Sequence, residues 1–215
     1  MSKCQSAMLP VGLLLAFLCA RCSNPERERL TSTTKATYDE RSGRLKELTY
    51  DANANGRVDT WTEMDGSRAV RSRLDRNEDG RIDRWEYYDA NGRVAKVGFS
   101  RRDNGQPDAW AEPGAQGQIA RVLVSSSGDE SRIDRWETYD PAAPDVPAAI
   151  EEDSNRDGRP DKWETYSAGQ LQRASFDENG DGRADRQLTY RAGVLVLIES
   201  EPQGNGEFRR RVEVK

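Results

Sequence analysis

The sequence predicts an all-β protein, an elongated antiparallel meander or solenoid of β-hairpin repeats about 24 residues long. Three observations predict it: a tandem repeat, short alternating runs between turn residues, and a composition too polar for one thick core. Hydrophobic residues make up 34% and charged residues 33% of the 215 residues, against about 45–50% and about 25% in ordinary globular domains. A thin sheet whose repeats contact mainly their neighbours suits this composition.

The tryptophans reveal the repeat. Each of the five occupies the eleventh position of a block, and aspartate occupies the ninth position of all six blocks. The blocks begin at Asp51, Asp75, Ser100, Ser126, Asp153 and Asp177, and the tryptophans are Trp61, Trp85, Trp110, Trp136 and Trp163. We expect the tryptophans to be packing rungs between neighbouring repeats, on one face of the sheet, rather than a sugar-stacking platform.

The segments between blocks predict the strands. Aromatic and β-branched residues follow the blocks, as in 163–166, and favour strands. Glycine turns with extended flanks, as in 88–94, join one repeat to the next. Each repeat therefore reads as strand, loop, strand and turn, which predicts about twelve short strands. Three prolines predict an enlarged turn over 141–152 that cannot be a central strand.

The amino end predicts export. Lys3 precedes an apolar run over 8–18 that is too short to span a bilayer as a helix, and this pattern is typical of a secretory signal. The segment 18–22 resembles a bacterial lipoprotein signal, although Arg21 stands where a small residue is expected. The resemblance implies that Cys22 is the first mature residue and carries lipid. An ordinary secretory signal cut near Ala20 is the alternative.

The predicted organisation has four parts: a signal peptide (1–21), a lipidated cysteine with a flexible tether (22–36), a six-fold β-repeat domain (37–190) and a closing hairpin (191–215). Histidine is absent, which excludes Ser/His and Cys/His nucleophile pairs and histidine zinc ligands. The net charge of −5 argues against a nucleic-acid partner. No pair of carboxylates stands outside the repeat positions, so no enzyme is predicted.

Four blocks carry the chemistry of a calcium loop, Asp-x-Asn-x-Asp/Asn-Gly-Arg-x-Asp. Oxygen-bearing side chains at positions 1, 3 and 5 can converge if the chain turns at the glycine of position 6. Position 7 would then add its carbonyl and position 9 a carboxylate. The candidate ligands are Asp51, Asn53, Asn55 and Asp59 in the first block, Asp75, Asn77, Asp79, Arg81, Asp83 and Glu86 in the second, Asp153, Asn155, Asp157, Arg159, Asp161 and Glu164 in the fifth, and Asp177, Asn179, Asp181 and Asp185 in the sixth.

We expect two to four calcium ions, with the blocks at Ser100 and Ser126 binding nothing or binding weakly. Two blocks, 75–86 and 153–164, match the full EF-hand loop pattern, but the repeat leaves no room for two flanking helices. The loops resemble the β-flanked calcium loops of thrombospondin type 3 and FG-GAP repeats, and the Tyr-Asp-x-x-Gly-Arg turns resemble those of RHS/YD-repeat proteins. The resemblance implies structural calcium and not catalysis.

These observations predict a non-enzymatic calcium-binding repeat lipoprotein of the bacterial cell envelope with a structural, adhesive or assembly role. It would be an outer-membrane lipoprotein, periplasmic or surface-exposed, held by its lipid anchor, with envelope proteins or glycans as possible partners. A carbohydrate-binding surface module using exposed Trp and Tyr, and a metal-free β-repeat structural protein, are the alternatives. Metal-free Asx turns account for the glycines and the adjacent Asp or Asn. Metal-free Asx turns are not expected to account for the aspartate at position 9.

Overall fold

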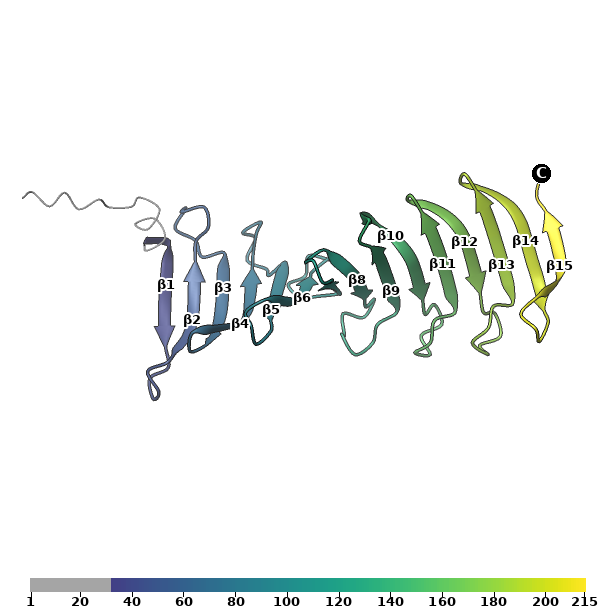
Figure 1. Ribbon diagram of the computed structural model, residues 1–215. Coiled ribbons are helices and arrows are strands. Elements are labelled where there is room, and N and C mark those ends of the chain that lie inside the picture. Colours follow the sequence, from purple (N-terminus) through teal and green to yellow (C-terminus); the bar gives the residue numbers. More distant parts are fainter. Residues whose placement is uncertain (1–31) are drawn as a thin grey trace, which may run out of the picture.

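A computed structural model describes residues 32–215. In this part of the chain, 15 antiparallel strands form one open sheet, in which strands consecutive in sequence pair with one another (Figure 1). The predicted all-β meander is confirmed. The strands are β1 Thr34–Tyr38, β2 Leu45–Tyr50, β3 Thr60–Asp65, β4 Arg68–Leu74, β5 Arg84–Tyr88, β6 Val94–Phe99, β7 Ala109–Pro113, β8 Ile119–Val124, β9 Arg135–Asp140, β10 Ala143–Glu152, β11 Lys162–Ser167, β12 Gln170–Phe176, β13 Arg186–Arg191, β14 Val194–Pro202 and β15 Phe208–Glu213.

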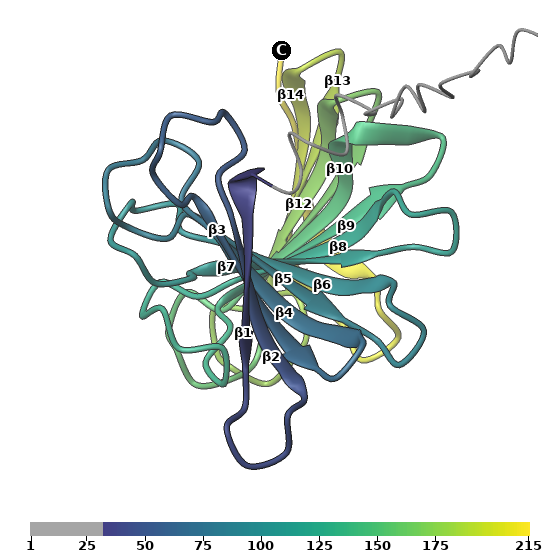
Figure 2. The ribbon, with the colours of Figure 1, turned by 90° about the vertical axis from the view of Figure 1, so that its left-hand side faces the viewer.

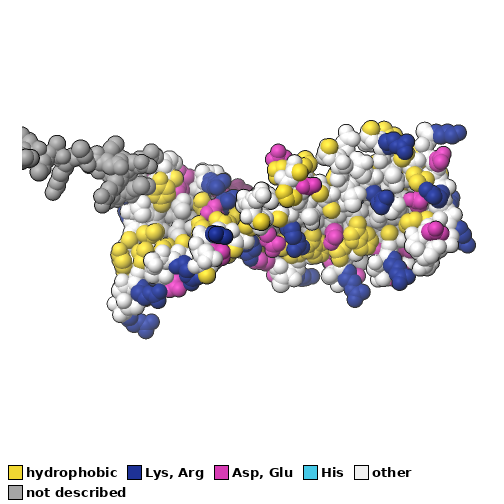
Figure 3. All heavy atoms as spheres, viewed as in Figure 1, with side chains coloured by type: hydrophobic (Ala, Val, Ile, Leu, Met, Phe, Trp, Pro, Cys, Tyr) yellow, Lys and Arg dark blue, Asp and Glu magenta, His cyan; other side chains and the backbone are white. Residues whose placement is uncertain are grey.

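The sheet is long, narrow and strongly twisted. Seen from its β1 end, the strands fan out around a common line (Figure 2). Neighbouring strands in a sheet rotate by about 20–25°, so 15 strands turn through most of a circle. Hydrophobic side chains reach the surface in separate patches interrupted by charged ones (Figure 3).

The tryptophans form one row across the sheet. They lie on β3, β5, β7, β9 and β11 in matching register: Trp85 and Trp110, for example, both pair with Gly98 of the intervening strand. The expectation that they share one face is therefore confirmed. A Cβ on Gly98 would lie 3.6 Å from Cδ1 of Trp110 and 3.3 Å from Pro107, so glycine allows the chains to pack closely here. Trp110 is only 1% exposed.

The opposite face has its own buried row. Val97, Ala111, Ile150 and Ala174 lie on that face, and all are buried. In a single-layer sheet, apolar burial is greatest along the middle of each strand, where side chains of neighbouring strands cover one another. The core therefore consists of two narrow rows of buried side chains, one on each face of the sheet, that run across the strands.

Two parts of the predicted organisation are wrong. β1 begins at Thr34, inside the segment 22–36 predicted as a tether, because its backbone pairs with β2 as far as Tyr50. The segment 141–152, predicted as an enlarged turn, contains β10. Its register shifts on both sides of Pro147, so the missing proline N–H groups fall where the ladder is interrupted. Only Ala149–Glu152 pairs with strands on both sides.

The remaining strands follow the predicted repeats: β2 to β13 are their twelve strands, and β14 and β15 form a hairpin at the carboxyl end. The predicted signal peptide, the lipidation of Cys22 and most of the tether lie outside the described residues. Within residues 32–215, no helix has the length and apolar character needed to cross a membrane.

Candidate metal centre

Six long loops lie along one side of the sheet, at the ends of the strands, because alternate connections of an antiparallel meander fall on the same side. We call this side the loop edge. We number them loops 1 to 6: 51–59, 75–83, 100–108, 125–134, 153–161 and 177–185. Their ends are joined by backbone hydrogen bonds, as where the Asp75 N–H donates to the Asp59 carbonyl at 2.8 Å and the Asp177 N–H donates to the Asp161 carbonyl at 2.8 Å. The loops therefore stand side by side along this edge.

Loop 4 begins one residue earlier than predicted. In loops 2, 3, 5 and 6 the first residue donates its N–H to the last residue of the preceding loop, and in loop 4 the residue that does so is Ser125, which donates to Asp108. The Ser126 N–H instead donates to a carboxylate oxygen of Asp134, which is the bond of a second position. Loop 4 therefore contains one more residue than the other loops, which the position of Trp136 alone does not reveal.

The ninth-position aspartate has the same structural role in all six loops. One carboxylate oxygen accepts the backbone N–H of the second residue, at 2.7–2.8 Å in five loops and 3.0 Å in loop 5. The aspartates are Asp59, Asp83, Asp108, Asp134, Asp161 and Asp185. This hydrogen bond closes each loop without a cation, in loops 3 and 4 as well as in the acid-rich ones. The expectation that metal-free turns leave position 9 unexplained is therefore wrong.

Positions 1 and 6 are linked in the four acid-rich loops. The first aspartate accepts the N–H of the sixth-position glycine at 2.7–2.9 Å. The pairs are Asp51–Gly56, Asp75–Gly80, Asp153–Gly158 and Asp177–Gly182. The glycine φ lies near +90° in loops 1, 2 and 5, which favours glycine at this position.

Positions 3, 5 and 7 form consecutive Asx turns. In loop 2, Asn77 accepts the N–H of Asp79, and Asp79 accepts the N–H of Arg81. The same two bonds recur in loops 1, 5 and 6 through Asn53 and Asn55, Asn155 and Asp157, and Asn179 and Asp181, with the N–H groups of Arg57, Arg159 and Arg183 as the last donors. These turns orient the predicted ligand side chains around the loop.

Loop 2 contains the one buried carboxylate oxygen that lacks a partner in the described chain. Asp75 is 5% exposed; its Oδ2 accepts from Gly80, but its Oδ1 has no hydrogen-bond partner. In loop 5 the corresponding Oδ1, of Asp153, accepts the Asp157 N–H at 3.2 Å. An anionic oxygen left buried without a partner is costly, and a bound cation would remove that cost.

The loop oxygens do not converge into a closed cage. Among residues 32–215, no three acidic or cysteine side chains lie close enough to hold an ion. The donor types fit calcium, and the orphaned oxygen of Asp75 fits a cation, but binding would draw the loop side chains inward.

The predicted position-12 glutamates belong to the sheet. Glu86 lies within β5 and accepts hydrogen bonds from Arg84 and Tyr88, and Glu164 lies within β11 and accepts one from Tyr166 beside its ion pair with Lys162. In an EF-hand a helix follows the loop, but in a strand residues three apart point to opposite faces. Glu86 and Glu164 therefore project away from the face of the ninth-position aspartates.

Electrostatics keep these glutamates charged. Burial raises the pKa of Glu86, but hydrogen bonds from Arg84 and Tyr88 outweigh it and leave the pKa below its usual value. The pKa of Glu164 is lowered in the same way, since the bonds from Lys162 and Tyr166 outweigh burial. Burial, followed by the bond to the neighbouring glutamate, raises the pKa of Tyr166 to about 12.

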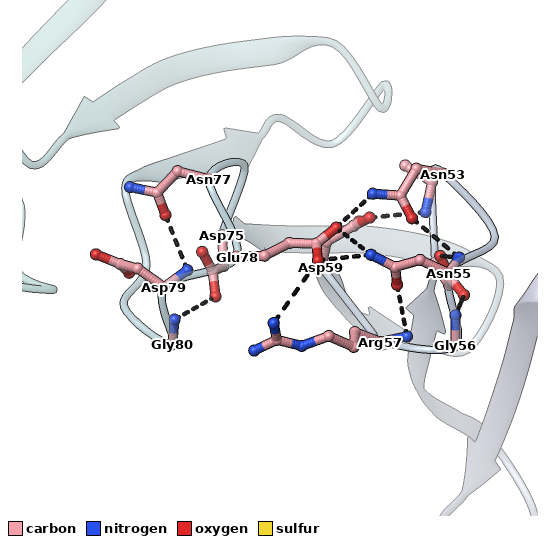
Figure 4. Close-up of polar contacts among 12 residues, drawn as sticks. Asn53, Asn55, Gly56, Arg57, Asp59, Asp75, Asn77, Glu78, Asp79 and Gly80 are labelled. Carbon is pink, nitrogen blue, oxygen red and sulfur yellow. Dashed lines mark hydrogen bonds and ion pairs between the residues drawn. The ribbon is translucent and has the colours of Figure 1, made fainter.

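Glu78 is a loop residue that the sequence analysis missed, because the repeat pattern leaves position 4 free. Glu78 has φ +57° and reaches from loop 2 to loop 1, where the side-chain amides of Asn53 and Asn55 donate to its carboxylate (Figure 4). The Asn55 contact is 2.6 Å to Oε2, and the Arg57 guanidinium lies 4.0 Å away. Glu78 therefore joins the two loops.

Comparisons with known proteins identify no family. No family model matches the chain, and no curated protein matches it. Among solved structures, TarM of S. aureus aligns with a TM-score of 0.36 and 12% identity over 49% of this chain and 22% of that one. An accessory secretory protein structure of Streptococcus pneumoniae aligns at 0.38 and 14% over 51% and 19%. The TcdB2-TccC3-Cdc42 structure aligns at 0.21 and 14% over 80% and 12%. The chain thus spans less than a quarter of the length of these proteins, and similarities this low carry no functional argument.

Proposed function

We propose that this protein is a non-enzymatic calcium-binding repeat lipoprotein of the bacterial cell envelope, with a structural, adhesive or assembly role. The observation that supports calcium best is the buried, unpartnered Oδ1 of Asp75 in loop 2. Asn77, Asp79 and Asp83 of the same loop carry oxygens of the hard type that calcium prefers. Loop 5 has the same residue types, and loops 1 and 6 are weaker versions, so two to four ions remain the expected number.

Calcium would act here as a structural ion. The sheet is a single layer with little apolar burial, so its loop edge gains stability if the clustered charges are neutralised. Binding would connect side chains already oriented by Asx turns. Extracellular calcium modules bind at about 10⁻⁴–10⁻³ M, and we expect this range or somewhat tighter.

Thermal unfolding of the full-length chain in detergent tests the calcium proposal. We expect calcium at millimolar concentration to raise the Tm, EGTA to reverse the effect, and magnesium to act weakly. Asp75→Asn and Asp79→Asn should each reduce the shift, whereas Asp103→Asn in the acid-poor loop 3 should leave it unchanged. Terbium luminescence sensitised by Trp85 would report binding directly. An unchanged Tm on addition of calcium, together with no terbium luminescence, would favour the metal-free alternative.

The envelope location has its own test. If Cys22 carries the anchor, the protein should fractionate with membranes and incorporate labelled palmitate in a bacterial host, and Cys22→Ser should abolish both. Cys19→Ser is the matched control and should change neither. Release of the unmodified wild-type protein into the soluble fraction would favour an ordinary secretory signal.

A further inference from the structure

Neighbouring loops are in contact along most of the edge. Glu78 joins loops 1 and 2, the Arg81 guanidinium donates to the Asp103 carbonyl of loop 3 at 2.9 Å, and the Arg102 guanidinium donates to the Ser126 carbonyl of loop 4 at 3.0 Å. Loops 5 and 6 leave a space of only about 10 Å³ between them. The loops along this edge thus generally pack against their neighbours.

Loops 4 and 5 are the exception. In the described chain, no side-chain hydrogen bond or ion pair joins them, and they are separated by an open groove of about 610 Å³. Loop 4 is the loop with the inserted residue, and it lines the groove with the short side chains of Ser126, Ser127 and Ser131. Small side chains on one wall, and the lack of a bridging residue, leave this space open. Its volume is that of a small-ligand site.

The groove combines an aromatic ring with unpaired polar groups. Trp136, half-buried at the start of β9, forms part of its lining. Arg132 and Arg156 also line it, and among residues 32–215 neither side chain makes a hydrogen bond or close ion pair. Arg156 stands at position 4 of loop 5 with φ +64°, which is the position from which Glu78 reaches the preceding loop.

The charges of the lining nearly balance. The lining contains two arginines and the carboxylates of Asp134, Asp153 and Asp157, each of which already accepts a backbone N–H. A strongly anionic ligand would therefore gain little, and Asp153 and Asp157 are the carboxylates that a cation in loop 5 would use. A neutral saccharide has an apolar ring face that can stack on an indole, and hydroxyl groups that can both donate to carboxylates and accept from guanidinium groups.

From this combination we propose that the groove between loops 4 and 5 binds a neutral oligosaccharide, with Trp136 as the stacking surface and Arg132 and Arg156 as hydrogen-bond donors. The groove adjoins the predicted cation site of loop 5, because Asp153 and Asp157 also line it, and the stacking and donor groups come from Trp136 and the two arginines. The proposal does not require calcium, since Trp136 and the arginines carry the recognition.

Calorimetric titration of the full-length chain tests the site, with cellotetraose, maltotetraose, xylotetraose and chitotetraose as probes. At least one should bind with a millimolar or tighter Kd and change tryptophan fluorescence. Trp136→Ala should weaken binding about tenfold or more, a loss of about 1.4 kcal/mol, and Trp136→Phe should retain most of it. Arg156→Ala should weaken it several-fold.

The matched controls are Trp163→Ala, which removes a half-buried tryptophan of the same row, and Arg183→Ala, which removes an exposed loop arginine outside the groove. Both should stay within twofold of the wild type. The titrations are repeated in calcium and in EGTA, and binding in either condition supports the site even if the calcium proposal fails. Failure of all four probes to bind, or equal losses from Trp136→Ala and Trp163→Ala, would overturn the proposal.

Discussion

The middle of the sheet and its flanks are stabilised differently. Around β7, Trp110 and its neighbours Ala109 and Ala111 are almost completely buried, and the adjoining loops 3 and 4 keep only the ninth aspartate of the calcium pattern. On either side, Trp61 and Trp163 are only half-buried, and the adjoining loops are rich in aspartate and asparagine. Trp85, which is also buried, adjoins acid-rich loop 2, and half-buried Trp136 adjoins loop 4, so the burial of a tryptophan and the acidity of the adjoining loop vary independently between repeats.

The largest expected effect is at the centre. Trp110→Ala should lower the unfolding free energy by about 3–5 kcal/mol, because it removes a fully buried indole. Urea denaturation should give the same loss with calcium and with EGTA. Trp61→Ala, at a half-buried position of the same row, should cost clearly less. Equal losses at the two positions would contradict the difference between centre and flank.

The second prediction concerns the hydrogen bond between the ninth-position aspartate and the second-position N–H, which closes the loops of both the centre and the flanks. Asp108→Ala should cost about 2–3 kcal/mol irrespective of calcium, because buried Asp108 accepts the Arg101 N–H and pairs with the Arg102 guanidinium. Asp108→Asn keeps one acceptor and should cost less. If calcium restored the stability of Asp108→Ala, position 9 would act through a cation even in loop 3.

The third prediction concerns alkaline pH. Burial, together with bonds to Glu137 and Glu164, raises the pKa of Tyr139 and of Tyr166 to about 12. Because the pKa of each tyrosine in the folded protein lies above its unfolded value near 10, the protonated tyrosines stabilise the fold below pH 10, and this contribution is lost between pH 10 and 12. After solvent screening we expect a loss of about 1 kcal/mol per tyrosine. Urea midpoints at pH 9 and pH 11.5 measure it. The double variant Tyr139→Phe/Tyr166→Phe should show a smaller drop.

The smallest expected effect is at the contact between loops 1 and 2. Glu78→Gln should lower stability by no more than about 1 kcal/mol, because it weakens the bonds to Asn53 and Asn55 at a partly exposed position. Hydrogen exchange at Asn55 and Arg57 should become faster, while exchange in loop 6 should not change. Unchanged exchange in loop 1 would show that Glu78 does not hold the two loops together.

The sequence by itself determined the repeat, the all-β meander and the common face of the tryptophans, because these follow from local periodicity and recur six times. Tertiary structure decided the features that depend on neighbouring strands. Pairing with β9 and β11 made part of the proline-rich segment a strand, and the hydrogen bonds of Ser125 revealed the inserted residue of loop 4. Strand alternation turned Glu86 and Glu164 away from the loops, because side chains in a strand change face at every residue whereas loop spacing alone carries no direction.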